Sequence, residues 1–345
     1  MTSGVLQAYL LAGAWLANET ATEPPITQSE WERVASPLLR TGSGPLAWWR
    51  MRFTALRESP PAPQFQDAYR AAALQSLLQS QALEQLGGRF QEYGVRPLLV
   101  KGWGVARHYP EAGLRPYDDF DFLVRPAELP AARQAVGAAW QVARVPVELH
   151  DRFNFPFDLT LEQMFSRAET ASLGPVQLLV PAPEDHLRLL CFHMLYHGAW
   201  RPLWLCDLAV MLWTHPNLDP RRLLTGDASR DAWVTHSLLL ARDVLGAELP
   251  PTLAEWLPPR PPGWLVSALL AQWGRGTGSS TQASLGKALR YAWPNPRRLL
   301  EVLRLRWQNP IEASLEVGAP CDESLRFPIQ LRAAGRRLGD RLRRR

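Results

Sequence analysis

Hydrophobic residues recur at helical spacing over about the first ninety residues of the chain. One face of a helix collects residues that are three and four positions apart, and two stretches have this pattern. They contain Trp31, Val34, Leu38 and Leu39, and further on Leu74, Leu77, Leu78, Ala82 and Leu86. Pro60, Pro61 and Pro63 separate the two stretches. The pattern predicts a helical N-terminal region over residues 1–93.

The chain starts with an apolar run from Val5 to Ala17 that Gln7 interrupts. No lysine or arginine precedes Arg33, whereas a secretory signal has a cationic start. We therefore expect an amphipathic helix here. No stretch of the sequence approaches the roughly 18–20 apolar residues of a membrane span, so no membrane partner is expected.

The hydrophobic pattern changes near Arg96, where short apolar runs bounded by glycine, proline and acidic residues replace the helical spacing. Such runs are typical of strands. Strands are predicted at 98–100, 120–124 and 145–150, with a further one at 175–180, and a helix with proline in its first turn at 126–140. Residues 94–182 are therefore predicted to form a core of mixed strands and helices.

Helical spacing returns after residue 181 and continues through most of the remaining chain. The proline-rich stretch 250–262 and the flexible, glycine-rich stretch 274–280 interrupt it. We predict a C-terminal helical domain over residues 183–325. The whole chain is then an α+β protein, with a small mixed sheet and its helices flanked by helical regions on both sides.

The composition is that of a globular protein, with 46% hydrophobic and 21% charged residues among 345. The formal charge of +5 is unevenly distributed, because residues 326–345 contain eight arginines and a single acid, Asp340. This segment is predicted to be a basic, arginine-rich tail, which either guides a polyanion or is a solvated helix end. The three cysteines, Cys191, Cys206 and Cys321, have no metal-type spacing and indicate a cytoplasmic protein.

Acidic and aromatic residues alternate in the predicted second strand. Successive side chains of a strand point to opposite faces, so Asp119 and Asp121 share one face while Phe120 and Phe122 are buried on the other. Two neighbouring carboxylates repel each other unless a cation lies between them, and Mg²⁺ suits such a pair because it prefers oxygen ligands. Asp118 faces the opposite side and is expected to be a turn or cap residue.

The third predicted strand repeats the combination of an acid with apolar neighbours. Glu148 lies between Val147 and Leu149, and His150 shares its face. If the second and third strands are neighbours, three carboxylates converge.

A lysine and a glycine follow the first predicted strand, at Lys101 and Gly102. Glycine lets backbone N–H groups approach phosphate oxygens, and the ammonium group adds a positive charge. Lys101 and Lys287 are the two lysines of the chain. Arg115 is expected either to clamp a phosphate oxygen or to fix its loop through a salt bridge.

Three histidines, His186, His193 and His197, share one stripe of a predicted helix. Three roles are open to them: a zinc site, contact with a nucleotide or an acceptor, and structural hydrogen bonds. Asp207 is expected to orient one of these histidines or Arg201.

The motifs between about Leu98 and Asp207 resemble those of the polymerase-beta-type nucleotidyltransferase superfamily, and most of all its uncharacterised nucleotidyltransferase family proteins. The resemblance implies that Asp119 and Asp121 are the first two metal ligands and Glu148 the third. It also implies that Gly102 and the following backbone hold nucleotide phosphates, with Lys101 beside them. Trp103 is a departure, because the superfamily has Gly-Ser or Gly-Gly at this turn.

The resemblance further implies a nucleotide-contacting helix with His193 and His197, followed by Arg201. The activity expected is Mg²⁺- or Mn²⁺-dependent transfer of a nucleoside monophosphate from a nucleoside triphosphate, with ATP the expected nucleotide, to an acceptor hydroxyl. His150 would assist as a base. The acceptor is a small molecule, a peptide or an RNA end, and the sequence indicates no oligomeric state. A toxin-like enzyme that modifies RNA or tRNA and a non-catalytic partner protein on a decayed fold are the alternatives.

Overall fold

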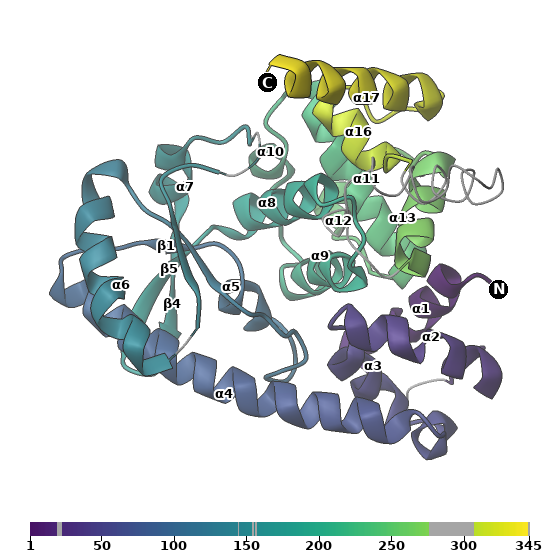
Figure 1. Ribbon diagram of the computed structural model, residues 1–345, viewed down its shortest axis with the longest axis horizontal. Helices are drawn as coiled ribbons and strands as arrows, with labels where there is room; N and C mark the ends of the chain where they lie inside the picture. The colour runs from purple at the N-terminus through teal and green to yellow at the C-terminus, as the bar shows by residue number, and fades with distance from the viewer. Residues whose placement is uncertain (19–22, 144, 154, 156, 276–306, 344–345) are drawn as a thin grey trace.

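The protein is an α+β structure in which helices surround a small five-stranded sheet, as the computed structural model shows (Figure 1). The structure describes residues 1–343 apart from 19–22, 144, 154, 156 and 276–306. The predicted fold class, a small mixed sheet with helical regions before and after it, is confirmed. Most of the segment predicted to be flexible, 274–280, and also Lys287, lie outside the described residues.

The strands are β1 (Leu98–Leu99), β2 (Phe120–Leu123), β3 (Val147–His150), β4 (Glu169–Leu173) and β5 (Val176–Val180). Their order in the sheet is β3-β2-β1-β5-β4. The pairs β2–β3 and β1–β5 are parallel, whereas β1–β2 and β4–β5 are antiparallel. Strand β4 was missing from the sequence prediction, because this edge strand buries a single residue, Ala171, and so lacks a hydrophobic run.

The two faces of the sheet pack against different helices. Phe120 and Phe122 face a core formed with α4 (Ala62–Glu92) and α6 (Leu129–Ala143). On the opposite face, Leu123 packs with residues of α7 (Leu161–Arg167) and α8 (Pro183–Tyr196). The alternation in β2 therefore directs the acidic residues towards the side of the sheet that α8 covers.

The N-terminal helices are α1 (Ser3–Leu11), α2 (Gln28–Arg40) and α3 (Gly44–Met51), with the 3-10 turns η1 (Ala14–Leu16) and η2 (Ala55–Glu58). The helix expected at 5–17 is shorter, because Gly13 adopts φ +63° after α1. It is also more deeply buried than an amphipathic surface helix: Gln7 is fully buried, and its amide donates to the Trp273 carbonyl oxygen at 2.8 Å.

Helix α4 runs for 31 residues from the N-terminal helices to the sheet (Figure 1). The predicted helix is confirmed here, but its apolar stripe is only partly buried. Leu86 lies in the core, whereas Leu74, Leu77 and Leu78 are exposed. In this middle stretch the small Ala73 and the buried Gln79 contact the segment before β2 instead, since a Cβ on Gly113 would lie 2.5 Å from the Ala73 nitrogen and Gln79 donates to the Tyr117 carbonyl oxygen.

The remaining helices are α5 (Trp103–Ala106), the turn η3 (Pro126–Glu128), α9 (Pro202–Thr214), α10 (Pro220–Leu223), α11 (Ala228–Leu245), α12 (Pro251–Ala254), α13 (Gly263–Arg275), α16 (Pro310–Glu316) and α17 (Arg326–Arg343). Trp31 of α2 and Leu269 of α13 belong to one hydrophobic core together with residues of α8, α9 and α11. The two helical regions that flank the sheet in sequence therefore pack together in space.

The arginine-rich segment forms helix α17, which packs on α16 (Figure 1). Arg326 is buried and pairs with Asp322, and Arg337 forms an ion pair with Glu316 at 2.6 Å. The segment is thus an ordered part of the C-terminal helices over its described residues. None of the described helices is both long and apolar enough to cross a membrane.

Candidate functional site

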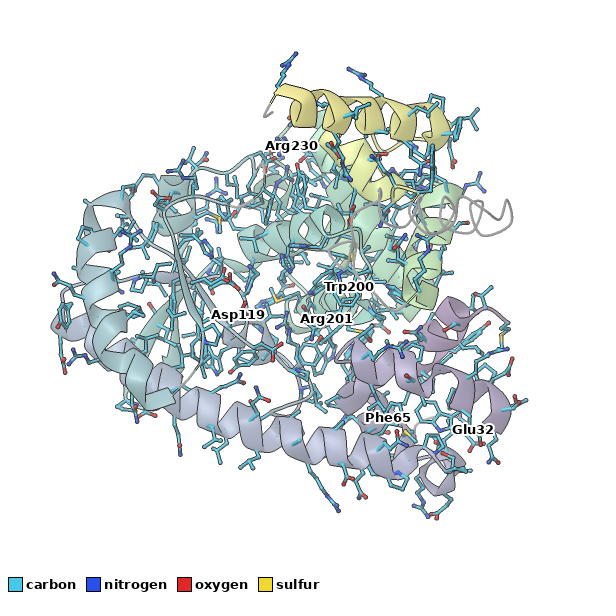
Figure 2. The ribbon with its side chains drawn as sticks, viewed as in Figure 1. Glu32, Phe65, Asp119, Trp200, Arg201 and Arg230 are labelled. Atoms are coloured by element: carbon cyan, nitrogen blue, oxygen red, sulfur yellow. The ribbon has the colours of Figure 1, made fainter. Side chains whose placement is uncertain are left out.

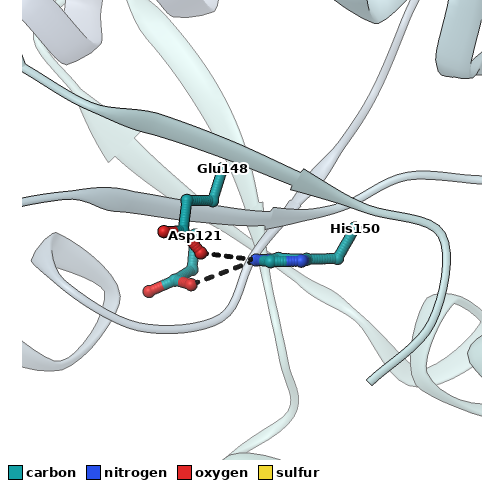
Figure 3. A group of neighbouring side chains, drawn as sticks. All are labelled: Asp121, Glu148 and His150. Atoms are coloured by element: carbon teal, nitrogen blue, oxygen red, sulfur yellow. Dashed lines mark hydrogen bonds and ion pairs between the residues drawn. The ribbon is translucent and has the colours of Figure 1, made fainter. Parts of the chain in front are cut away.

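Two acidic residues and a histidine meet where β2 pairs with β3. The parallel register places Asp121 beside Glu148 and Leu123 beside His150, so that all four side chains share one face. Nε2 of His150 lies 3.3 Å from Oδ1 of Asp121 and 3.1 Å from Oε2 of Glu148 (Figure 3). One ligand atom from each of the three residues lies within 4.8 Å of the others, which is close enough to share a cation.

Asp119 precedes β2 and lies on the same side of the sheet, in the half of the molecule that contains the strands (Figure 2). Its side chain is partly buried. Burial, and then the negative charge of Asp121, raise the pKa of Asp119. A cation bound nearby would relieve this strain, because an ionised carboxylate is favoured by an opposite charge.

Lys101 directly follows β1, the other neighbour of β2. Its Nζ lies 2.8 Å from Oδ1 of Asp121, and the Val100 N–H donates to the Asp121 carbonyl oxygen at 3.0 Å. Burial by itself would raise the pKa of Asp121, but the hydrogen bond from His150 and the charge of Lys101 lower it to about 2. The bond to Asp121 in turn raises the pKa of His150. Asp121 is therefore an ionised carboxylate held between Lys101 and His150.

Gly102 allows the chain to turn sharply between Lys101 and α5. Its backbone adopts φ +59° and ψ −120°, a conformation that favours glycine. A Cβ at this position would lie 2.9 Å from the Asp119 carbonyl oxygen and 3.3 Å from the Tyr117 ring. The absence of a side chain thus lets the turn approach the residue that precedes β2.

Arg115 does not extend towards the carboxylates but is buried against α9. Its Nε and one terminal nitrogen donate to the two carboxylate oxygens of Asp207, at 3.1 and 2.9 Å. The Tyr109 hydroxyl donates to the same carboxylate at 2.8 Å. Of the two roles predicted for Arg115, the structure has the salt bridge that fixes the loop. The prediction that Asp207 orients a histidine or Arg201 was wrong. The buried carboxylate instead accepts hydrogen bonds from Arg115 and Tyr109, which lie next to it.

The predicted histidine stripe divides between two roles. His186 is fully buried, and its Nε2 lies 3.0 Å from the Val100 carbonyl oxygen, which ties α8 to the end of β1. His193 and His197 lie near Lys101, and burial lowers the pKa of both. They are thus neutral near pH 7. Arg201 donates from Nε to the Thr41 carbonyl oxygen at 2.7 Å, so its contact is with the N-terminal helices.

A cavity of about 280 Å³ opens beside Lys101 and His150, between the sheet and α8. Aromatic and aliphatic side chains form most of its wall. They include Phe153, Phe155, Tyr196, Leu123 and Leu189, with His193, His197 and Arg152 among the polar lining residues. Sequence reasoning missed this wall. The signal was present in the alternation of phenylalanines at 153, 155 and 157, which follows β3 directly.

Comparison with known proteins matches the chain to a family. The model of a family described as "Uncharacterised nucleotidyltransferase" matches residues 27–244, which contain the sheet, the acidic cluster and the cavity. No curated protein and no solved structure matches the chain.

Proposed function

We propose, from the premise that the chain belongs to the uncharacterised nucleotidyltransferase family, that it transfers a nucleoside monophosphate from a nucleoside triphosphate to an acceptor hydroxyl and releases pyrophosphate. The observation that carries this proposal is the meeting of Asp121, Glu148 and His150 beside Lys101 and the Gly102 turn. The family membership supports nucleotidyl transfer in general, and the arrangement of these residues supports the particular roles given below.

The acidic residues just before β2, in β2 and in β3 are suited to bind a hard divalent cation. Asp119, Asp121 and Glu148 supply carboxylate oxygens, which Mg²⁺ and Mn²⁺ prefer. Asp121 is already ionised and paired with Lys101 at 2.8 Å, which supports the binding of a cation at this position. A bound Mg²⁺ or Mn²⁺ ion would polarise the phosphate oxygens and neutralise charge that develops during transfer.

The remaining residues position the reactants. Lys101 and the backbone at Gly102 would hold the phosphates of the nucleotide, with ATP the first nucleotide to test. The acceptor oxygen attacks the α-phosphorus, the bond from the α-phosphorus to the bridging oxygen breaks, and pyrophosphate leaves. The hydroxyl proton passes to the His150 side chain, whose basicity Asp121 increases. Phosphoryl transfer depends mainly on positioning and charge neutralisation, so few protein groups are required.

The experiment that tests this proposal combines each α-³²P-labelled nucleoside triphosphate with Mg²⁺ or Mn²⁺ and three acceptor pools: a metabolite extract, peptides and total RNA. We expect label to enter one pool with the wild-type protein, and not with Asp119→Ala or with EDTA. Arg57→Ala, which removes an exposed side chain in η2, should behave as the wild type. Absence of transfer with every nucleotide, or transfer that survives in Asp119→Ala, would contradict the proposal.

We also propose a cellular location and keep the predicted division of the chain into regions. The three cysteines are buried and free, which supports a location in the reducing cytoplasm. The division into residues 1–93, 94–182, 183–325 and 326–345 stays a prediction.

A further inference from the structure

We infer that the cavity beside His150 is the acceptor site, and that it takes a small uncharged molecule carrying a hydroxyl group on an aromatic or apolar skeleton. This inference rests on the proposed function and specifies the substrate class of the same site. It is carried by the position of the cavity, by its aromatic wall and by the charge state of the residues that line it.

The cavity meets the side proposed to bind phosphate at Lys101. Lys101 and His150 line the cavity, whereas Gly102 and Asp119 do not. A nucleotide held at the Gly102 turn therefore leaves the cavity free, and a hydroxyl group at its mouth lies next to His150, the proposed proton acceptor. The two reactants would approach the acidic cluster from different sides, as transfer from one to the other requires.

The wall of the cavity is built from rings that already pack against one another. Phe155 stacks on Tyr196 with ring centroids 5.3 Å apart and an angle of 24° between the planes. Phe153 packs edge-on against Phe157 at 4.5 Å, and Phe157 contacts Phe192 of α8. The wall thus exists before any ligand binds, and a preformed apolar wall favours a flat or apolar group.

The charged groups of the cavity are neutralised, among the residues that the structure describes. The Lys101 ammonium is paired with Asp121, and the exposed Arg152 pairs with Asp151 at 3.0 Å. His193 and His197 are neutral near pH 7 because burial lowers the pKa of both. An anionic acceptor such as an RNA end would compete with Asp121 and Asp151 for the cations of this wall, whereas an uncharged acceptor would not.

The size of the cavity sets the upper limit of the acceptor. Small-molecule sites usually measure about 300–1,000 Å³, so about 280 Å³ suits a single ring with short substituents. The base of a nucleotide has a similar size and is the rival occupant. A test of the cavity must therefore distinguish an aromatic alcohol from a nucleoside.

The experiment measures binding and needs no transfer reaction. Benzyl alcohol and adenosine serve as probes in separate saturation-transfer NMR titrations of the full-length protein, without nucleotide. We expect benzyl alcohol to bind, and Phe155→Ala to weaken it about tenfold, the effect of losing an aromatic contact together with its buried area. Tyr93→Ala, which removes an exposed ring at the end of α4, should bind benzyl alcohol as the wild type does.

Several outcomes would overturn the inference. Adenosine binding that falls in Phe155→Ala while benzyl alcohol binding does not would assign the cavity to the nucleotide base. Failure of benzyl alcohol to bind the wild type, or equal binding to wild type and Phe155→Ala, would remove the cavity as an aromatic site. If Phe155→Ala does not fold, Phe155→Leu keeps apolar volume without the ring and decides the same question, again by a loss of benzyl alcohol affinity.

A final variant separates this inference from the proposed function. Asp119→Ala leaves the cavity wall intact, so it should bind benzyl alcohol as the wild type does even though transfer is expected to be lost. Binding of benzyl alcohol without nucleotidyl transfer by the wild type would contradict the proposed reaction and leave the cavity as a binding site for an aromatic alcohol. Nucleotidyl transfer by the wild type without benzyl alcohol binding would support the proposed reaction and overturn the assignment of the cavity.

Discussion

The guanidinium of Arg115 and the carboxylate of Asp207 form a buried, bidentate ion pair, although 92 positions separate the two residues in the chain. Asp207 lies on α9, and Arg115 lies in the segment that leads to Asp119 and β2. The pair therefore couples the position of the proposed metal ligands to the packing of the C-terminal helices.

Breaking this pair should destabilise the protein severely. Arg115→Ala leaves the Asp207 carboxylate buried without its cation, which typically costs about 3–5 kcal/mol. We expect a correspondingly lower free energy of unfolding in urea denaturation. Arg57→Ala, which breaks an exposed ion pair with Glu58, should change it by less than about 1 kcal/mol. Equal losses in the free energy of unfolding for the two substitutions would show that the buried pair stabilises the protein no more than the exposed pair does.

Asp119 and Asp121 should respond differently to neutralisation when no metal is present. Burial and Asp121 disfavour the ionised form of Asp119, so Asp119→Asn should keep or raise the melting temperature in EDTA. Asp121 is held ionised by His150 and Lys101, so Asp121→Asn should lower the melting temperature by leaving both side chains without their charged hydrogen-bond partner. An Asp121→Asn protein that melts at or above the wild-type temperature would contradict the claim that His150 and Lys101 stabilise an ionised Asp121.

A methyl group at Gly102 should disturb the site as well as the backbone. Gly102→Ala adds the cost of a positive φ, about 1–2 kcal/mol, and drives a Cβ to within 2.9 Å of the Asp119 carbonyl oxygen. Gly94→Ala is a matched control, because Gly94 has φ +67° with no atom within 4 Å of the added Cβ. We expect calorimetry to show weaker Mg²⁺-ATP binding in Gly102→Ala alone. The same loss in both variants would mean that the Gly102 turn does not serve nucleotide binding.

The buried His186 should make the protein less stable in acid. Burial lowers its pKa to about 3, whereas the unfolded chain has a histidine pKa of about 6.5. Below about pH 6.5 the histidine is protonated in the unfolded chain but stays neutral in the folded protein. The free energy of unfolding therefore falls as the pH falls from about 6.5 towards 3. Between pH 7 and 5 this one residue should account for about 2 kcal/mol.

His186→Gln removes that proton uptake while keeping a donor for the Val100 carbonyl oxygen. The stability advantage of the wild type over the variant should therefore shrink by about 2 kcal/mol from pH 7 to 5 in urea denaturation. A difference that stays constant with pH would show that His186 does not resist protonation in the folded state.

Arg326 and Arg337 of α17 are engaged with acidic residues of their own chain. The exposed arginines of α17 should also add little to RNA binding, because the acceptor inferred for the cavity is a small uncharged molecule. We expect single-stranded RNA affinity, measured over a range of salt concentrations, to have the same slope in the wild type and in an Arg332→Ser, Arg343→Ser double variant. Each phosphate contact contributes about 0.7 to that slope. Flattening by about 1.4 units in the double variant would instead support an RNA acceptor that contacts α17.

Local sequence patterns were sufficient to predict the class of fold and which residues share a face. The alternation of Asp119, Phe120, Asp121 and Phe122 predicts the acidic face of β2, because the pleat of a strand has a period of two. The helical spacing of apolar residues predicts most helices for the same kind of local reason. The exposed leucines of α4 show the limit of such patterns, which indicate a face without saying what covers it.

Only the tertiary structure decided which of these faces and side chains meet. The contact of Lys101 with Asp121, the register that places Glu148 beside Asp121, and the pairing of Arg115 with Asp207 all join segments far apart in the chain. The cavity wall likewise needs the segment after β3 to pack on α8. Contacts of this kind depend on how whole elements pack, and the spacing of residues along one segment contains no information about the segment that will lie against it.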